Sequence, residues 1–362
     1  MLGTMIFVQL AGLAVVIFGF YRLRQWLGYF REENTRLAVQ HSDELKEAQA
    51  RVKDLQWQVD LWEQRMARWD DPRRLIWPEP VHLDRRLETL AEVAARPMAA
   101  VTDELRAFLH AVQPPDAASG AYLAEHRERL AFTLAQVPPG GERALELGTY
   151  GVMAAEVQRV FGYSTVEGGD QTGSGEMQVA IAGQAPFRLP MQAFDAERDQ
   201  FPYPGDSFDL VLACEIIEHF VTDPMHCLLE CRRVLRDGGT LLLTTPNIAS
   251  HTAIGRVLQG SEHPNLFPLY SREPAHRPHV HEYAPYELAT LLHDAGFELV
   301  RIATRRAANF NSVDWVMPLL EKFRFPTLLR GEQLFVVAVK RAANPTVRYP
   351  AYLYEAATPR AD

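Results

Sequence analysis

Short apolar runs alternate with helix-like segments from about Arg143 to the end of the chain. Alternation of this kind predicts a doubly wound α/β sheet whose central strands are parallel. We expect a seven-stranded, Rossmann-like sheet with strands at Arg143–Leu147, Ser164–Gly168, Phe187–Phe194, Phe208–Ala213, Gly239–Thr244, Phe297–Thr304 and Gln333–Val339.

The chain before this sheet has two other patterns. Residues 5–21 contain no charged side chain, and Arg22, Arg24 and Arg31 follow them. This predicts a single transmembrane helix that leaves the rest of the chain in the cytoplasm, with a cleaved signal peptide or a buried helix as the alternative. Within residues 31–71, apolar side chains recur at alternating steps of three and four, at Leu45, Ala48, Val52, Leu55, Val59, Trp62, Met66 and Trp69.

Such a seam is typical of a coiled coil that pairs copies of the chain into a homo-oligomer. An amphipathic helix lying on the chain's own globular domain is the alternative. We therefore expect a membrane anchor (1–30), a coiled coil (31–71), a proline-containing helical linker (72–119), the α/β domain (120–341) and a C-terminal tail (342–362).

Charge and cysteine content narrow the class of protein. The formal net charge of −9 argues against a nucleic-acid binder built on a basic face. Cys214, Cys227 and Cys231 lack the paired spacing of a zinc site, and they are too few for a disulfide framework. Reduced cysteines of this kind agree with a cytoplasmic domain.

A glycine turn follows the first strand. Gly148 and Gly151 lie between the end of this strand, which carries Glu146, and the start of a helix. Glycines at such a turn let the backbone approach a ligand closely, and the helix contributes free N–H groups. Asp170 ends the next strand, where a carboxylate would accept hydrogen bonds from ribose hydroxyls.

A further acidic cluster, Glu197 and Asp199, follows the third strand and is placed to reach an adenine amino group. The pattern so far predicts a nucleoside-containing cofactor.

Several motifs, in order, resemble those of class I S-adenosylmethionine-dependent methyltransferases: "ALELGTYG", "GGD", "ERDQFPYPGDSFDLVLACEIIEH", "CRRVLRDGGTLLLTTPN" and "HVHEYAPYELATLLHDAGF". The resemblance covers roughly residues 120–341. It implies that Glu146, Gly148 and Gly151 surround the methionine part of S-adenosylmethionine, that Asp170 binds the ribose, and that Glu197 or Asp199 lies near the adenine. The chain departs from the family's G-x-G-x-G row, because Thr149, Tyr150 and Gly151 follow Gly148. A Rossmann dehydrogenase is disfavoured because the G-x-G-x-x-G row is absent and the "TPN" element has no role in hydride transfer.

The resemblance places "CEIIEH" where the methyl donor meets its acceptor. Glu215, Glu218 and His219 would share one face of a helical turn and are the candidate catalytic residues. The run is similar to the metal site of plant small-RNA 2′-O-methyltransferases. That similarity selects His279 over His281 as the fourth ligand of Mg²⁺ or Mn²⁺, beside Glu215, Glu218 and His219. The alternative is a metal-free site with His219 as the general base.

Within the class, the motifs are most similar to bacterial methyltransferases found with surface-polysaccharide and glycolipid synthesis. We therefore expect an enzyme at the inner (cytoplasmic) membrane that methylates a hydroxyl of a glycan or lipid-linked sugar acceptor. Aromatic residues in the segment 264–285, such as Phe267, Tyr270 and Tyr283, would stack on sugar rings or pack the loop. The alternatives are a quinone- or lipid-directed O-methyltransferase and an inactive scaffold of the same fold.

Overall fold

The computed structural model describes residues 89–114, 117–149, 151–260, 279–306, 313–323, 325–344 and 346–350, with the isolated positions 19, 22–26, 28 and 353. The predicted coiled coil and most of the predicted anchor lie outside these residues. Among the residues it describes, none of the helices combines the length and apolar character needed to cross a membrane. The chain divides into a larger unit (86–254, 264–314 and 328–362) and a smaller one (1–85, 255–263 and 315–327).

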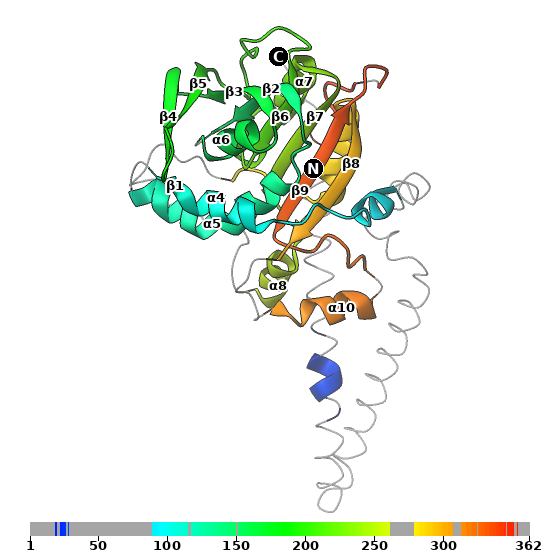
Figure 1. The fold of residues 1–362 in the computed structure, drawn as a ribbon. Helices are drawn as coiled ribbons and strands as arrows, with labels where there is room; N and C mark the ends of the chain where they lie inside the picture. The colour runs from blue at the N-terminus through cyan, green and yellow to red at the C-terminus, as the bar shows by residue number, and fades with distance from the viewer. Residues whose placement is uncertain are drawn as a thin grey trace, which may run out of the picture. The chain divides into compact units, whose positions relative to one another are not determined.

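The larger unit is built on a nine-stranded sheet in the order β1-β4-β5-β3-β2-β6-β7-β9-β8 (Figure 1). Its strands are β1 (Val112–Gln113), β2 (Gly141–Leu147), β3 (Tyr163–Asp170), β4 (Gly175–Ile181), β5 (Phe187–Ala193), β6 (Phe208–Cys214), β7 (Leu235–Pro246), β8 (Phe297–Arg305) and β9 (Gln333–Lys340). All seven expected strands are present, with ends shifted by a few residues. The sheet is nevertheless larger than expected, because β1 and β4 extend it beyond β5.

The five central strands β5, β3, β2, β6 and β7 are parallel. The chain runs outward from β2 to β3 and β5, then returns to β6 on the other side of β2. A reversal of this kind makes a topological switch point, beside which open α/β sheets bind their ligands. Leu147 is in register with Gly169 on one side and with Ala213 on the other, so the carboxyl ends of three strands meet here.

Helices cover both faces of the sheet (Figure 1). On one face, α4 (Asp103–Ala111), α5 (Ala117–Ala135) and α6 (Val152–Arg159) share a core with the side chains of Ala144 and Leu212. On the other, α7 (Pro224–Val234) and α9 (Pro285–Asp294) pack with Leu145 and Val211. Neighbouring residues of a strand contribute to opposite cores because strand side chains alternate between faces.

Two shorter elements follow the strands that carry the site. The 3₁₀ turn η2 (Ile217–His219) follows β6, and α8 (His251–Gln259) follows β7. The Asp223 side chain caps α7 by accepting a hydrogen bond from the backbone N–H of His226, and Pro224 begins the helix. In the smaller unit, the structure describes α10 (Val316–Lys322).

Candidate active site

The turn after β2 takes a left-handed shape that favours glycine at two positions. Gly148 and Gly151 have φ angles of 64° and 74°. A Cβ atom on Gly148 would lie 2.7 Å from Ile216 Cγ2, and one on Gly151 would lie 2.5 Å from Val179 Cγ2. Thr149, which stands where the family's glycine row would continue, accepts a hydrogen bond of 2.6 Å from Gly151 N through its own Oγ1. The irregular motif therefore still forms a tight turn.

Glu146 supports this turn through a hydrogen bond to the helix that follows it. Its buried Oε2 accepts a hydrogen bond of 2.9 Å from Ala154 N in the first turn of α6. Burial raises the pKa of the Glu146 carboxyl to about 7, although its hydrogen bonds oppose the shift. Glu146 fixes strand to helix and shapes the turn that would receive the methionine part of the cofactor.

Asp170 lies beside the glycine turn, as expected. Gly148 N donates a hydrogen bond of 2.8 Å to Gly169 O, which joins the ends of β2 and β3. Asp170 Oδ1 accepts hydrogen bonds from the N–H and the hydroxyl of Thr172, at 2.9 and 3.0 Å. These bonds orient the carboxylate at the end of the strand, where ribose hydroxyls would be bound.

The structure gives Glu197 and Asp199 structural partners. Buried Glu197 accepts hydrogen bonds from the backbone N–H groups of Thr222 and Asp223 through Oε1. Asp199 Oδ2 accepts a hydrogen bond of 2.8 Å from Asp195 N. Both carboxylates therefore fasten the loop after β5, and the carboxylate nearest the end of that strand belongs to half-buried Asp195.

The sequence patterns did not single out Arg129, which α5 carries to the end of β6. One end of its guanidinium pairs with Glu215 Oε2, and Nη2 donates a hydrogen bond of 2.5 Å to the Tyr122 hydroxyl. Arg129 Nε is buried and has no hydrogen-bond partner among the described residues. An arginine on an amphipathic helix gives no local signal of its role, because only the fold brings it to Glu215.

Glu215 begins the turn after β6 with a left-handed backbone, at φ 55°. Its Oε1 accepts hydrogen bonds from the Thr244 hydroxyl, at 2.7 Å, and from Gln333 Nε2. Burial raises the pKa of the Glu215 carboxyl, and the neighbouring Arg129 charge opposes that shift. A strained non-glycine residue held by this many partners is typical of a functional position.

The structure brings Glu218, His219 and His279 together. One ligand atom from each side chain lies within 4.8 Å of the others, a spacing that could hold a metal ion. Glu218 is fully buried, and its Oε2 accepts a hydrogen bond of 2.8 Å from the Thr245 hydroxyl. Its Oε1 has no hydrogen-bond partner among the described residues and lies 4.0 Å from His219 Nε2.

The segment that carries His279 is fixed by Glu218 itself. The backbone N–H groups of Val280 and His281 donate to Glu218 O at 2.7 and 3.2 Å. The His219 and His279 rings meet edge to face with centroids 4.9 Å apart, and His279 Nδ1 lies 2.9 Å from Glu282 Oε1. The His281 side chain pairs with Glu287 at 2.7 Å. Among the described residues, the cluster of possible metal ligands includes His279 and not His281.

Burial raises the pKa of the Glu218 carboxyl well above its usual range, and the nearby Glu215 charge raises it further. A buried carboxyl with one unsatisfied oxygen and two imidazoles nearby favours a cationic occupant, because a cation would stabilise the ionised form. The oxygen and nitrogen donors of this cluster suit Mg²⁺, Mn²⁺ or a similar divalent ion without selecting one.

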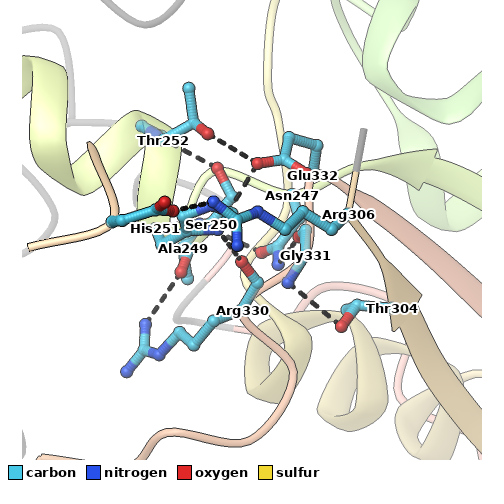
Figure 2. Close-up of polar contacts among 12 residues, drawn as sticks. Asn247, Ala249, Ser250, His251, Thr252, Thr304, Arg306, Arg330, Gly331 and Glu332 are labelled. Carbon is cyan, nitrogen blue, oxygen red and sulfur yellow. Dashed lines mark hydrogen bonds and ion pairs between the residues drawn. The ribbon is translucent and has the colours of Figure 1, made fainter. Parts of the chain in front are cut away.

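A buried polar network holds the turn after β7 (Figure 2). Asn247 Nδ2 donates hydrogen bonds to Leu329 O and Gly331 O, at 2.9 and 2.7 Å, and Asn247 N donates to Glu332 O. His251 Nδ1 lies 2.7 Å from Arg330 O, so this histidine is a packed residue at the start of α8. The network fixes the segment that leads into Gln333, the partner of Glu215.

The aromatic residues expected to line the acceptor site are either packed in the core or outside the described residues. Tyr283 is 1% exposed and packs in the core with α9, so it is not a stacking platform for sugars. Phe267 and Tyr270 lie outside the described residues.

Comparisons with known proteins agree with this geometry. The family described as a methyltransferase domain matches residues 116–302, and the chain belongs to that family. The protein is an S-adenosylmethionine-dependent methyltransferase. The glycine turn, Asp170 and the buried Arg129 Nε suit its cofactor. The ribose of that cofactor offers hydroxyls, and its methionine part offers a carboxylate.

The chain is similar to proteins named ubiquinone biosynthesis O-methyltransferase. The one from Roseobacter denitrificans is 26% identical over 182 residues, which are 49% of this chain and 67% of that protein. The one from Thiobacillus denitrificans is 28% identical over 178 residues, which are 47% and 70%. Among solved structures, the chain is similar to a putative methyltransferase from Haloferax volcanii, determined in complex with the Trm112 methyltransferase activator. The two chains are 18% identical, the TM-score is 0.42, and the match covers 67% of this chain and 100% of that one.

Proposed function

We propose that this protein transfers the methyl group of S-adenosylmethionine to a hydroxyl oxygen, and that the acceptor is a phenolic ring of the quinone-precursor class. The observation that carries O-methylation is the cluster of Glu218, His219 and His279 beside the cofactor turn, because a hydroxyl must lose its proton before it attacks. The relatives named ubiquinone biosynthesis O-methyltransferase support the phenolic acceptor over a glycan.

The cofactor supplies an electrophilic methyl group, and displacement of the sulfur asks the protein mainly for alignment. Gly148 and Gly151 admit the cofactor close to the backbone, and Asp170 receives its ribose hydroxyls. Arg129 Nε, which is buried and has no hydrogen-bond partner within the described structure, is the proposed donor to the cofactor carboxylate. Asp195 is the proposed adenine contact because it stands two residues after the end of β5, where the backbone N–H of Glu197 donates to its Oδ1.

Glu218 Oε1, His219 and His279 would hold a divalent cation, which would acidify an acceptor hydroxyl bound to it. In a site without the ion, His219 takes the hydroxyl proton at Nε2. The Glu218 carboxylate, 4.0 Å away, would stabilise the resulting positive charge.

The test measures transfer of labelled methyl from S-adenosylmethionine by the full chain. We expect methylation of 3,4-dihydroxybenzoate, loss of turnover in EDTA and recovery with Mn²⁺ or Mg²⁺. Full activity in EDTA would remove the metal ion from the proposal. Methylation of a methyl glycoside but not of 3,4-dihydroxybenzoate would show that the acceptor is a glycan and not a phenol. An absence of heat on titration with millimolar S-adenosylmethionine would favour the scaffold.

Membrane attachment and self-association belong to the same proposal. The uncharged segment 5–21 motivates an inner-membrane anchor with a cytoplasmic catalytic domain, and the seam from Leu45 to Trp69 motivates a homo-oligomer. An anchor would hold the active site close to an apolar, membrane-borne acceptor. Deletion of residues 31–71 is expected to reduce the oligomer to a monomer in sedimentation, and an unchanged mass would refute the seam.

A further inference from the structure

Glu215 and Glu218 lie on the same short turn but have opposite surroundings. Both oxygens of Glu215 are engaged, Oε2 by Arg129 and Oε1 by Thr244 and Gln333. Glu218 instead keeps Oε1 without a hydrogen-bond partner among the described residues. The cluster whose ligand atoms converge contains Glu218, His219 and His279, and it leaves Glu215 out.

The partners of Glu215 come from three separate elements of the fold. Arg129 belongs to α5, Thr244 to β7 and Gln333 to β9. Gln333 is itself fixed, because the network in Figure 2 ties the preceding residues 329–332 to the turn after β7. Moving Glu215 onto a metal ion would leave the Arg129 guanidinium, whose side chain is only 14% exposed, without its counter-charge. Leaving a buried charge unpaired is strongly unfavourable.

Arg129 is linked to the cofactor turn through Glu215. The next residue after Glu215, Ile216, lies beside Gly148, since a Cβ atom on that glycine would touch it. Two of the guanidinium nitrogens of Arg129 are used by Glu215 and Tyr122, while Nε is buried without a partner in the described structure. An unused donor in this position requires an acceptor, and the carboxylate of the methionine part is the anionic group that S-adenosylmethionine offers.

We infer that Glu215 is a positioning residue of the cofactor pocket, which orients Arg129 toward the cofactor carboxylate, and that it is not a ligand of the metal ion. The inference rests on the proposed function, and it divides the "EIIEH" run into two halves with separate tasks. A metal held by Glu218, His219 and His279 alone would keep coordination positions open for the acceptor oxygen and water.

The test compares two nucleosides that differ in the group Arg129 would bind. S-Adenosylhomocysteine carries the amino-acid carboxylate, and 5′-methylthioadenosine lacks it. We measure the binding of both by calorimetry, and the binding of Mn²⁺ by electron paramagnetic resonance. The full chain is used with Glu215→Gln, Arg129→Gln, the double variant and Glu218→Gln. Glu128→Gln is the matched control, because Glu128 precedes Arg129 on α5 and pairs with exposed Arg106.

We expect Glu215→Gln and Arg129→Gln each to weaken S-adenosylhomocysteine binding by about tenfold, as for loss of one charge-assisted contact. The double variant should bind no more weakly than Arg129→Gln alone, since both changes remove the same contact. Binding of 5′-methylthioadenosine should stay unchanged, which a general loss of structure would not allow. Mn²⁺ should bind to Glu215→Gln as to the wild type, and Glu218→Gln should lose it.

Loss of Mn²⁺ binding in Glu215→Gln to the extent seen in Glu218→Gln would overturn the inference. An equal loss of both nucleosides would also overturn it, because the effect would then not pass through the carboxylate. A wild-type protein that binds neither nucleoside refutes the proposed function itself. If the wild type binds the nucleosides but no Mn²⁺, the metal leaves the proposed function, and the nucleoside comparison still decides the role of Glu215.

Discussion

The Thr245 hydroxyl donates a hydrogen bond of 2.8 Å to Glu218 Oε2, while Oε1 of the same buried carboxylate has no partner among the described residues. Strand β7 therefore holds one oxygen and orients the other toward His219 and His279. Glu218 therefore presents a buried carboxylate oxygen to the two imidazoles of the cluster.

Replacement of Glu218 by Gln should reduce kcat by about 10²-fold or more, because the substitution removes the charge that holds a cation or stabilises a protonated His219. The affinity for S-adenosylhomocysteine should stay within about twofold, since the proposed cofactor contacts lie elsewhere. Steady-state kinetics and calorimetry check the two values.

Glu176→Gln is the matched control, because it neutralises an exposed carboxylate of β4 that pairs with Arg188. Equal activity of Glu218→Gln and this control would contradict the assigned role of Glu218.

The glycine turn gives a prediction with an internal control. Gly148→Ala should lose about 1–2 kcal/mol of unfolding free energy from its left-handed backbone, and also bind S-adenosylhomocysteine more weakly because the new Cβ displaces Ile216. Gly140 has a φ angle of 77°, and a Cβ added there would meet open space, so Gly140→Ala should lose stability alone. Chemical denaturation and calorimetry separate the two effects, and identical cofactor affinities would refute the steric role of Gly148.

The buried carboxyl of Glu156 should make the unfolding free energy of the protein depend on pH. It is fully buried on α6, and neither carboxylate oxygen has a hydrogen-bond partner among the described residues. Burial raises its pKa to about 7 from 4.5, with Glu104 adding to the shift and Arg159 opposing it.

A raised pKa means that the folded protein binds this proton more tightly than the unfolded chain does. The stabilisation is fully present below pH 4.5 and is lost as pH rises to about 7, at up to roughly 1.4 kcal/mol per pH unit. Relative to wild type, Glu156→Gln should become more stable across this window. Urea unfolding at several pH values measures the difference, and a difference that does not change with pH would contradict the assignment.

Asn247→Ala should destabilise the protein by about 2–4 kcal/mol, because it leaves the carbonyls of Leu329 and Gly331 unsatisfied in a buried place. It should also raise the Kd for S-adenosylhomocysteine, since the network positions Gln333 on Glu215. Asn344→Ala, near the C-terminus and half-buried, should do neither. Wild-type stability in Asn247→Ala would show that the network is not structural.

The sequence predicted the parallel centre of the sheet well because apolar runs, glycine turns and strand ends are local signals. Strand β4 was missed although four residues of its "GEMQVAI" run are apolar, and β1 was missed because two residues carry no pattern. The family resemblance implied a metal site of Glu215, Glu218, His219 and His279, and the described structure brings the ligand atoms of the last three together. Arg129 and Gln333 could not be predicted as partners of Glu215, because each contact depends on how distant elements pack. The same holds for the backbone contacts that engage Glu197.

Side chains of strand β4 pack against the cofactor turn, although this strand was not expected from the sequence. Val179 and Met177 of this outer strand lie where a side chain on Gly151 would have to go, and the two residues of β1 pair with the strand's other side. A peripheral hairpin of β4 and β5 therefore packs against the turn that would receive the cofactor. Substitutions in these outer strands would change the affinity for the cofactor. The outer strands are therefore a place where the enzyme can be tuned without replacing any residue that would contact the cofactor.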